Sequence, residues 1–317
     1  MVEAIGVPFD LCGKRMGSRL GPAALRLAGL EEAFDELHVD FAWGGDIKGC
    51  SEEELGEARE AKEFSALIAC IAELRTRTST ALESGKTPLV IGGDHAIAMG
   101  SIAAGLNHHG EKMALLWIDA HADINTPGSS VTGNVHGMPV AALMGFGSGV
   151  TGERDVTWNS LVESLGPTRL KMEHMAWCGL RDVDPPERDL IRSHGACMAT
   201  TMYDVDRYGL IWELRRFDVW MRAQQATHLW ISFDVDSLDP ILAPGTGTAV
   251  TGGFSYREAH LIAEVIYEML SAENCPYKLA GLDVVEINPL FDKNNETAKM
   301  AVQWIGSLFG KSILGVR

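Results

Sequence analysis

The sequence contains no uninterrupted apolar run of the roughly 18 residues that a membrane-spanning helix needs. Met1 is followed at once by a strand-like segment, residues 2–7, and not by the charged and then apolar segments of a secretory signal. The cysteines include no C-x-x-C pair, and several lie within apolar stretches, as reduced core thiols do. We therefore expect a cytoplasmic protein in a reducing environment.

Basic residues are scarce, with 27 against 43 acidic ones, and the formal net charge is −16. Such a balance disfavours nucleic acid and anionic membranes as partners and favours metals and cationic substrates. Part of the acidity is expected to be a solvated helix surface, formed by Glu52, Glu53, Glu54, Glu57, Glu60 and Glu63. Charge is thus in agreement with a cation site but does not prove one.

The chain also lacks a Pro/Ser-rich linker, an internal repeat and a low-complexity tract, so residues 1–317 are expected to form one domain. Gly92-Gly93 follows a predicted strand but continues as Asp-His, and not as the rest of a G-x-G-x-x-G fingerprint. We therefore do not expect a Rossmann-type nucleotide site there. With 46% hydrophobic residues, the chain can build a large buried core.

Short apolar runs alternate with helical segments, a pattern typical of parallel strands joined by crossover helices in an α/β fold. Strands are predicted at 4–7, 88–91, 114–118, 175–180, 229–233 and 279–285. A long helix is predicted to follow a capping box at Ser51 and Glu54, with Leu67, Ile71 and Leu74 at helical spacing. Further helices are predicted at 96–106, 256–271 and 294–309.

Three of these strands are followed directly by residues that bind metals. The candidate ligands are His95, Asp119, His121, Asp123, Asp234 and Asp236. Residues two apart on an extended chain point to one side, so each group can aim at one point. Aspartate after a strand can also be a simple helix cap or turn former. However, four aspartates buried together without a cation would repel one another. The donors outnumber the ligands of one tetrahedral zinc, which favours two harder ions such as Mn²⁺ bridged by shared aspartates.

These segments resemble the ureohydrolase family, which includes arginase and agmatinase, and the similarity runs from Pro8 to Leu314. The metal-ligand segments carry it together with Gly-Pro-Ala-Ala-Leu-Arg at 21–26, Ala-Pro-Gly-Thr-Gly-Thr at 243–248 and Glu-Ile-Asn-Pro at 286–289. The resemblance is greatest to arginase. It implies a three-layer α-β-α sandwich around a mainly parallel central sheet.

The resemblance also implies a role for each candidate site residue. Asp119 and Asp234 would bridge two Mn²⁺ ions, one completed by His95 and Asp123 and the other by His121 and Asp236. A hydroxide shared by the ions would attack the guanidinium carbon. Glu286 resembles the residue that holds the guanidinium, His136 resembles the histidine that shuttles protons, and Asp123 is counted with the catalytic residues as well.

Substrate choice is predicted from three further segments. Asp184 and Glu187 resemble the acids that recognise a substrate α-amino group, although an acidic turn stiffened by prolines would give the same sequence. The residues that resemble the α-carboxylate binders are Asn125, Thr132 and Asn134, and Thr248 lies in a third substrate-binding segment. An amino-acid headgroup is implied, which favours arginine over agmatine.

The leading hypothesis is a manganese-dependent enzyme that converts L-arginine to L-ornithine and urea, and that works as a homo-oligomer, a trimer or hexamer by family resemblance. A hydrolase of N-hydroxyarginine, agmatine or a guanidino acid would use the same metal ligands. A zinc-dependent amide deacetylase would need one metal and fewer carboxylates. A metal-free scaffold protein would be expected to have lost ligands, and none of the six is missing.

Overall fold

An eight-stranded sheet forms the centre of the molecule in a computed structural model, which describes residues 1–13, 15–48 and 59–316. The strand order is β2-β1-β3-β8-β7-β4-β5-β6, and all neighbours run parallel. The strands are β1 (Val2–Val7), β2 (Phe41–Asp46), β3 (Thr87–Gly92), β4 (Met113–Ile118), β5 (Met175–Leu180), β6 (Met198–Thr201), β7 (His228–Asp234) and β8 (Lys278–Val285). Near the C-terminus β9 (Lys311–Ser312) and β10 (Gly315–Val316) form an antiparallel pair.

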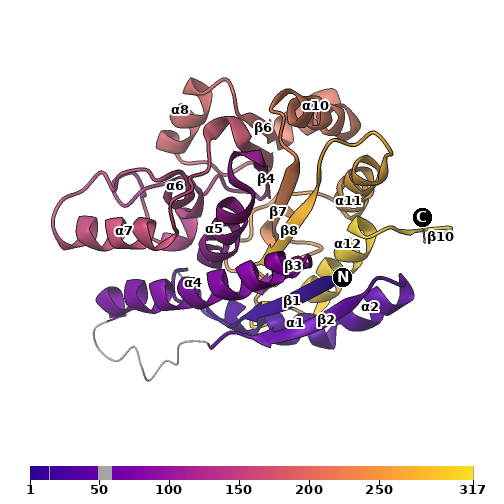
Figure 1. The fold of residues 1–317 in the computed structure, drawn as a ribbon, viewed down its shortest axis with the longest axis horizontal. Helices are drawn as coiled ribbons and strands as arrows, with labels where there is room; N and C mark the ends of the chain where they lie inside the picture. The colour runs from indigo at the N-terminus through magenta and orange to yellow at the C-terminus, as the bar shows by residue number, and fades with distance from the viewer. Residues whose placement is uncertain (14, 49–58, 317) are drawn as a thin grey trace.

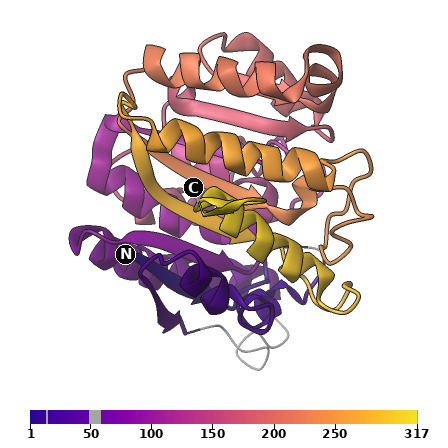
Figure 2. The same cartoon turned by 90° about the vertical axis from the view of Figure 1, so that its right-hand side faces the viewer.

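Helices cover both faces of this sheet (Figures 1 and 2). One layer contains α4 (Arg59–Glu83), α5 (Ala98–His109), α6 (Pro139–Met144) and α7 (Glu153–Ser164). The opposite layer contains α1 (Gly21–Leu27), α2 (Leu30–Glu36), α9 (Met202–Tyr208), α10 (Leu210–Ala223), α11 (Tyr256–Ser271) and α12 (Glu296–Leu308). The predicted three-layer α-β-α sandwich with a parallel sheet is confirmed.

The central strands are rich in apolar residues because both of their faces are buried. In β4, Leu116 and Ile118 pack into the core beneath α10, α11 and α12, whereas Leu115 and Trp117 pack into the core beneath α4 and α5. Successive side chains of a strand point to opposite faces, so each core receives every second residue. This double coverage fixes the strands whose carboxyl ends carry the candidate ligands.

Predicted and observed elements differ mainly at the edges of the sheet. Helix α11 has the predicted bounds, while α5 and α12 each begin two residues later than predicted. The edge strands β2 and β6 were not predicted, because partial exposure breaks the apolar run that marks central strands. The predicted capping box and the acidic helix surface at 51–63 lie outside the residues whose side chains are described. No helix in the described ranges combines the length and apolar character needed to cross a bilayer.

Candidate metal centre

Four adjacent central strands deliver polar side chains to one edge of the sheet. His95 lies in a short 3-10 turn after β3, Asp119 directly follows β4, Asp234 ends β7, and Glu286 directly follows β8. The carboxyl ends of parallel strands meet at the same edge, where open α/β sheets bind their ligands. Sequence segments almost two hundred residues apart are thereby brought into contact.

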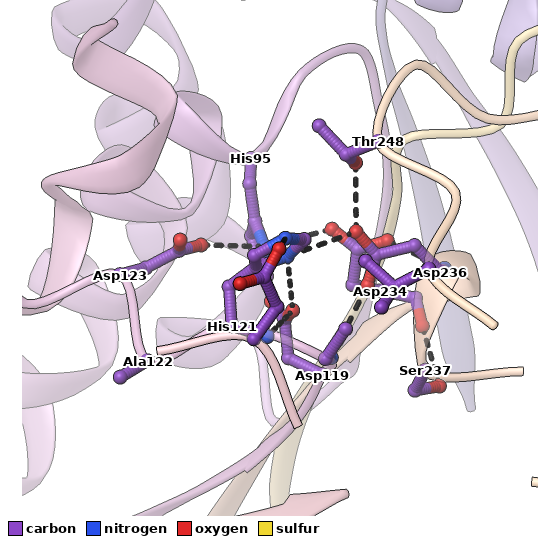
Figure 3. Close-up of polar contacts among 12 residues, drawn as sticks. His95, Asp119, His121, Ala122, Asp123, Asp234, Asp236, Ser237 and Thr248 are labelled. Atoms are coloured by element: carbon purple, nitrogen blue, oxygen red, sulfur yellow. Dashed lines mark hydrogen bonds and ion pairs between the residues drawn. The ribbon is translucent and has the colours of Figure 1, made fainter. Parts of the chain in front are cut away.

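The first group of donors surrounds the imidazole of His95. Its Nδ1 lies 3.0 Å from Asp119 Oδ2, 3.2 Å from Asp123 Oδ2 and 3.1 Å from Asp234 Oδ2 (Figure 3). The Asp123 backbone has φ 51°, in the left-handed region that L residues seldom adopt. Three carboxylate oxygens therefore contact one ring nitrogen, and those of Asp119 and Asp234 also lie within 4.8 Å of each other.

Two contacts, with Trp117 and Ser232, fix the orientation of the His95 ring. Its ring stacks on the buried Trp117 indole with centroids 3.9 Å apart and planes inclined by 6°. Its Nε2 lies 2.9 Å from Ser232 Oγ, which leaves Nδ1 turned toward the carboxylates. A metal-binding histidine is normally oriented through its second nitrogen in this way.

A second group of donors forms around His121. Its Nδ1 lies 3.3 Å from Asp119 Oδ1 and 3.1 Å from Asp236 Oδ2. The Thr248 hydroxyl donates to Asp236 Oδ2 over 2.7 Å and holds that carboxylate in place. Asp119 thus contributes one oxygen to each group, the arrangement that a bridging carboxylate requires. Asp234 Oδ2 contacts His95 of the first group, and Asp234 Oδ1 accepts the backbone N–H of Asp236 in the second group over 2.8 Å.

The electrostatics of this cluster match those of a cation site. Burial and the charges of Asp236 and Asp119 raise the pKa of Asp234, and burial together with the Asp119 charge raises the pKa of Asp123 to about 6. His95 Nδ1 and Asp119 Oδ2 are buried without a hydrogen-bond partner among the described residues, although they lie 3.0 Å apart. Buried, mutually repelling oxygen donors are the ligand set that hard divalent ions take. The residues present therefore fit a metal pair.

A cavity of about 200 Å³ opens beside the donors. Every predicted site residue lines it except Asp119 and Glu286, which are buried. The lining residues that were predicted are His95, His121, Asp123, Asn125, Thr132, Asn134, His136, Asp184, Glu187, Asp234, Asp236 and Thr248. The donors and the candidate substrate residues thus share one space.

The walls of this cavity are joined by polar contacts. Asn125 Nδ2 donates to Asp184 Oδ2 over 2.9 Å, and its Oδ1 accepts from the Ser129 hydroxyl over 2.8 Å. Thr132 Oγ1 accepts the Asn134 backbone N–H over 3.2 Å. The Asn125 amide and the Asp184 carboxylate therefore lie next to each other in the lining of the cavity.

The prolines after Asp184 begin a helix and are not simply stiffeners of a turn. Helix α8 (Pro185–Ser193) has Asp184 as its N-cap and Glu187 as the reciprocal partner in a capping box. Burial and the charge of Asp123 raise the pKa of Glu187 to about 7. An Asp-Pro-Pro-Glu sequence carries both helix-start signals, a capping pair and proline in the first turn.

Glu286 connects the catalytic candidates. Its Oε1 lies 2.9 Å from His136 Nδ1 and accepts the His95 backbone N–H, also over 2.9 Å. Burial opposes protonation of His136, but the hydrogen bond and charge of Glu286 outweigh it and raise the His136 pKa to about 9. His136 is therefore held as a cation at neutral pH in the metal-free protein.

The family model of the arginase family matches residues 2–310. The chain belongs to the arginase family. It is 36% identical to an arginase of Bacillus caldovelox over 315 residues, which covers 99% of both chains. The structure of the B. caldovelox arginase at pH 5.6 superposes with a TM-score of 0.86 at 35% identity, covering 98% of this chain and 99% of that one. An Entamoeba histolytica arginase, solved in complex with L-ornithine, is 27% identical, with a TM-score of 0.82 and 98% of each chain covered.

Membership in the arginase family confirms the predicted enzyme class, that of a ureohydrolase with a binuclear metal site. Sequence reasoning missed three further residues that line the cavity, Ser130, Gly137 and Asp182. The Asp182 carboxylate lies 3.8 Å from His121 Nε2 and is largely exposed. Its position two residues before Asp184, in the same acidic segment, was the signal that could have revealed it.

Proposed function

We propose that this chain is a manganese-dependent arginase that hydrolyses L-arginine to L-ornithine and urea. The observation that carries the proposal is the position of Asp119, which joins two donor groups directly beside a cavity lined by both acidic and amide side chains. The ornithine complex of the E. histolytica relative supports an amino-acid headgroup.

Two Mn²⁺ ions are proposed because the donors are mainly carboxylates, which suit hard divalent ions. His95, Asp119, Asp123 and Asp234 would hold one ion, and Asp119, His121, Asp234 and Asp236 the other. When bound, such a pair supplies activated water at neutral pH. A zinc deacetylase would leave several of these carboxylates without a partner.

The protein's own groups would orient the guanidinium and handle the leaving proton. Glu286 Oε1 already accepts two N–H groups, so its second oxygen is the one proposed to accept from the cationic guanidinium. Water adds to the guanidinium carbon, the bond to the ornithine nitrogen breaks, and that nitrogen takes up a proton. The proton donor is proposed to be His136, which lies at the cavity wall.

Both charged groups of the substrate's amino-acid headgroup would be bound by residues that line the cavity. The carboxylate of Asp184 would pair with the substrate ammonium, and the polar groups of Asn125, Thr132 and Asn134 would bind its carboxylate. Thr248 is proposed to act in this cavity through its bond to Asp236. Agmatine has no carboxylate and would leave the polar groups of Asn125, Thr132 and Asn134 without that partner.

The proposal is tested by loading the protein with Mn²⁺ and comparing L-arginine, agmatine, N-hydroxyarginine and 4-guanidinobutyrate in parallel. We expect kcat/KM for arginine to exceed that for agmatine by at least about a hundredfold. Each buried polar group that is left without a hydrogen-bond partner costs about 1–3 kcal/mol. Urea and hydroxyurea release are the measured quantities. A wide preference for agmatine or the guanidino acid would overturn the substrate assignment.

His136→Ala is expected to lower kcat by about a hundredfold or more, because a positioned acid contributes about 10²–10⁴ in rate. Metal content should remain at two ions per chain, since His136 belongs to neither donor group. Elemental analysis and urea assays of the same sample measure both quantities. A parallel loss of metal would show that His136 supports the metal centre and would contradict its assignment as a proton donor.

We further infer one functional domain, a cytoplasmic location and a homo-oligomer, a trimer or hexamer as in the family it resembles. The thiols of Cys197 and Cys275 donate to backbone carbonyls, which suits a reducing compartment. Tyr203, Trp212 and Val219 expose 60% or more of their surface on α9 and α10, which supports a protein contact there.

A further inference from the structure

Glu187 joins two parts of the site through its carboxylate. Oε1 accepts the Ile124 backbone N–H over 2.9 Å, and Oε2 accepts the Asp184 backbone N–H over 3.0 Å. The residue is only 4% exposed. Each oxygen of this buried carboxylate is therefore engaged by a backbone group, and the two groups lie far apart in the sequence.

The amide that Glu187 holds belongs to the residue after Asp123, whose left-handed backbone is unfavourable for an L side chain. Such a conformation persists only when its surroundings determine it. The Asp123 carbonyl accepts the Val140 N–H over 3.0 Å, and the next amide, that of Ile124, is fixed by Glu187. The direction of the Asp123 carboxylate toward the metal centre depends on both contacts.

A second contact joins the same two segments, because Asn125 Nδ2 donates to Asp184 Oδ2 over 2.9 Å. Two hydrogen bonds from consecutive residues, Ile124 and Asn125, thus attach the metal-ligand segment to the start of α8. These two hydrogen bonds connect the segment that carries Asp184 to the segment that carries Asp123.

We infer that Glu187 is a positioning residue for the metal ligand Asp123, and that it couples the Asp184 wall of the cavity to the metal centre. The inference rests on the proposed function only in taking Asp123 as a metal ligand. It differs from the role that the family resemblance implies, in which Glu187 recognises the substrate amino group. A substrate contact alone would affect the affinity for arginine, whereas a positioning residue affects the affinity for metal as well.

The test uses Glu187→Gln, in which the amide NH₂ replaces one acceptor and faces a backbone N–H. We expect Mn²⁺ affinity to fall about 10–100-fold, the usual effect of losing a group that orients a ligand. Titration of the metal-free protein with Mn²⁺, followed by electron paramagnetic resonance of the free ion, measures this without any activity assay. Circular dichroism and thermal unfolding of the metal-free variant check that it is folded.

Asp184→Asn is the matched control, because asparagine caps a helix and still accepts from Asn125. It should raise KM for arginine and leave Mn²⁺ affinity unchanged. If Glu187→Gln binds both ions with unchanged affinity and only KM rises, the positioning role is wrong and Glu187 is a substrate contact. Should Glu187→Gln not fold, Glu187→Asp provides the same comparison with a shortened carboxylate. Failure of the wild type to hydrolyse arginine would overturn the proposed function but leave this metal titration decisive.

Discussion

Asp119→Ala is expected to remove both metal ions and, with them, the hydrolytic activity. Asp119 is the residue shared by the two donor groups, one oxygen lying near His95 and the other near His121. Because bound metal lowers the pKa of water from 15.7 to about 7, its loss should reduce kcat by at least about a thousandfold. Elemental analysis after dialysis and urea release from arginine measure the two effects.

The control for Asp119→Ala is Glu213→Gln, which neutralises another buried carboxylate, one held by Thr200 and Arg216 beside β6. This variant should keep both ions. Wild type should gain about 2.7 kcal/mol of stability at a Mn²⁺ concentration 100 times the Kd, and Asp119→Ala should lose that gain. Two tightly bound ions and a normal rate in Asp119→Ala would disprove the bridging role.

Glu286→Gln is expected to lower kcat/KM for arginine by about 10²–10³-fold, the effect of removing one group that stabilises charge in the transition state. The amide oxygen can still accept the His95 N–H, so the metal histidine should stay in place. However, the variant lacks the negative charge that is proposed to bind the guanidinium cation of the substrate. Steady-state kinetics with arginine, together with metal analysis, measure these effects.

The same substitution should also shift the dependence of rate on pH. In the metal-free protein Glu286 raises the His136 pKa to about 9, so the protonated form persists below that pH. Without the Glu286 charge the His136 pKa should fall, and activity that requires the protonated form should be lost at lower pH than in wild type. A pH–rate profile measured from pH 6 to 10 tests this. An unchanged alkaline limb would show that another group donates the proton.

Most of the candidate donor cluster could be predicted from the sequence because the donors follow strands that are buried on both faces. Those strands are recognisable as apolar runs, and β5 has the predicted bounds of 175–180. The alternate residues 119 and 121, and 234 and 236, come together in a bend and a 3-10 turn, and not in the extended chain that the spacing suggested. The edge strands β2 and β6 escaped prediction because they are partly exposed, and their burial depends on neighbours distant in sequence.

The contacts of the residues that are proposed to bind the substrate were harder to predict. Asp184 and Glu187 were identified as acids of a substrate loop, but their capping box and the helix that follows were not. The contact between Glu187 and the Ile124 amide spans 63 residues, and no local pattern indicates it. Glu286 was predicted to hold the guanidinium, and no local pattern indicates that its Oε1 is engaged by His95 and His136.

The sequence by itself determined the ligand types, their spacing along each strand and the α/β class, because periodicity and donor chemistry are local properties. Only the tertiary structure decided which oxygen of Asp119 faces which histidine, and which acidic side chain is already engaged by the backbone. Those outcomes depend on the strand order and on the left-handed turn at Asp123, which bring together donors from distant segments to within about the length of a hydrogen bond.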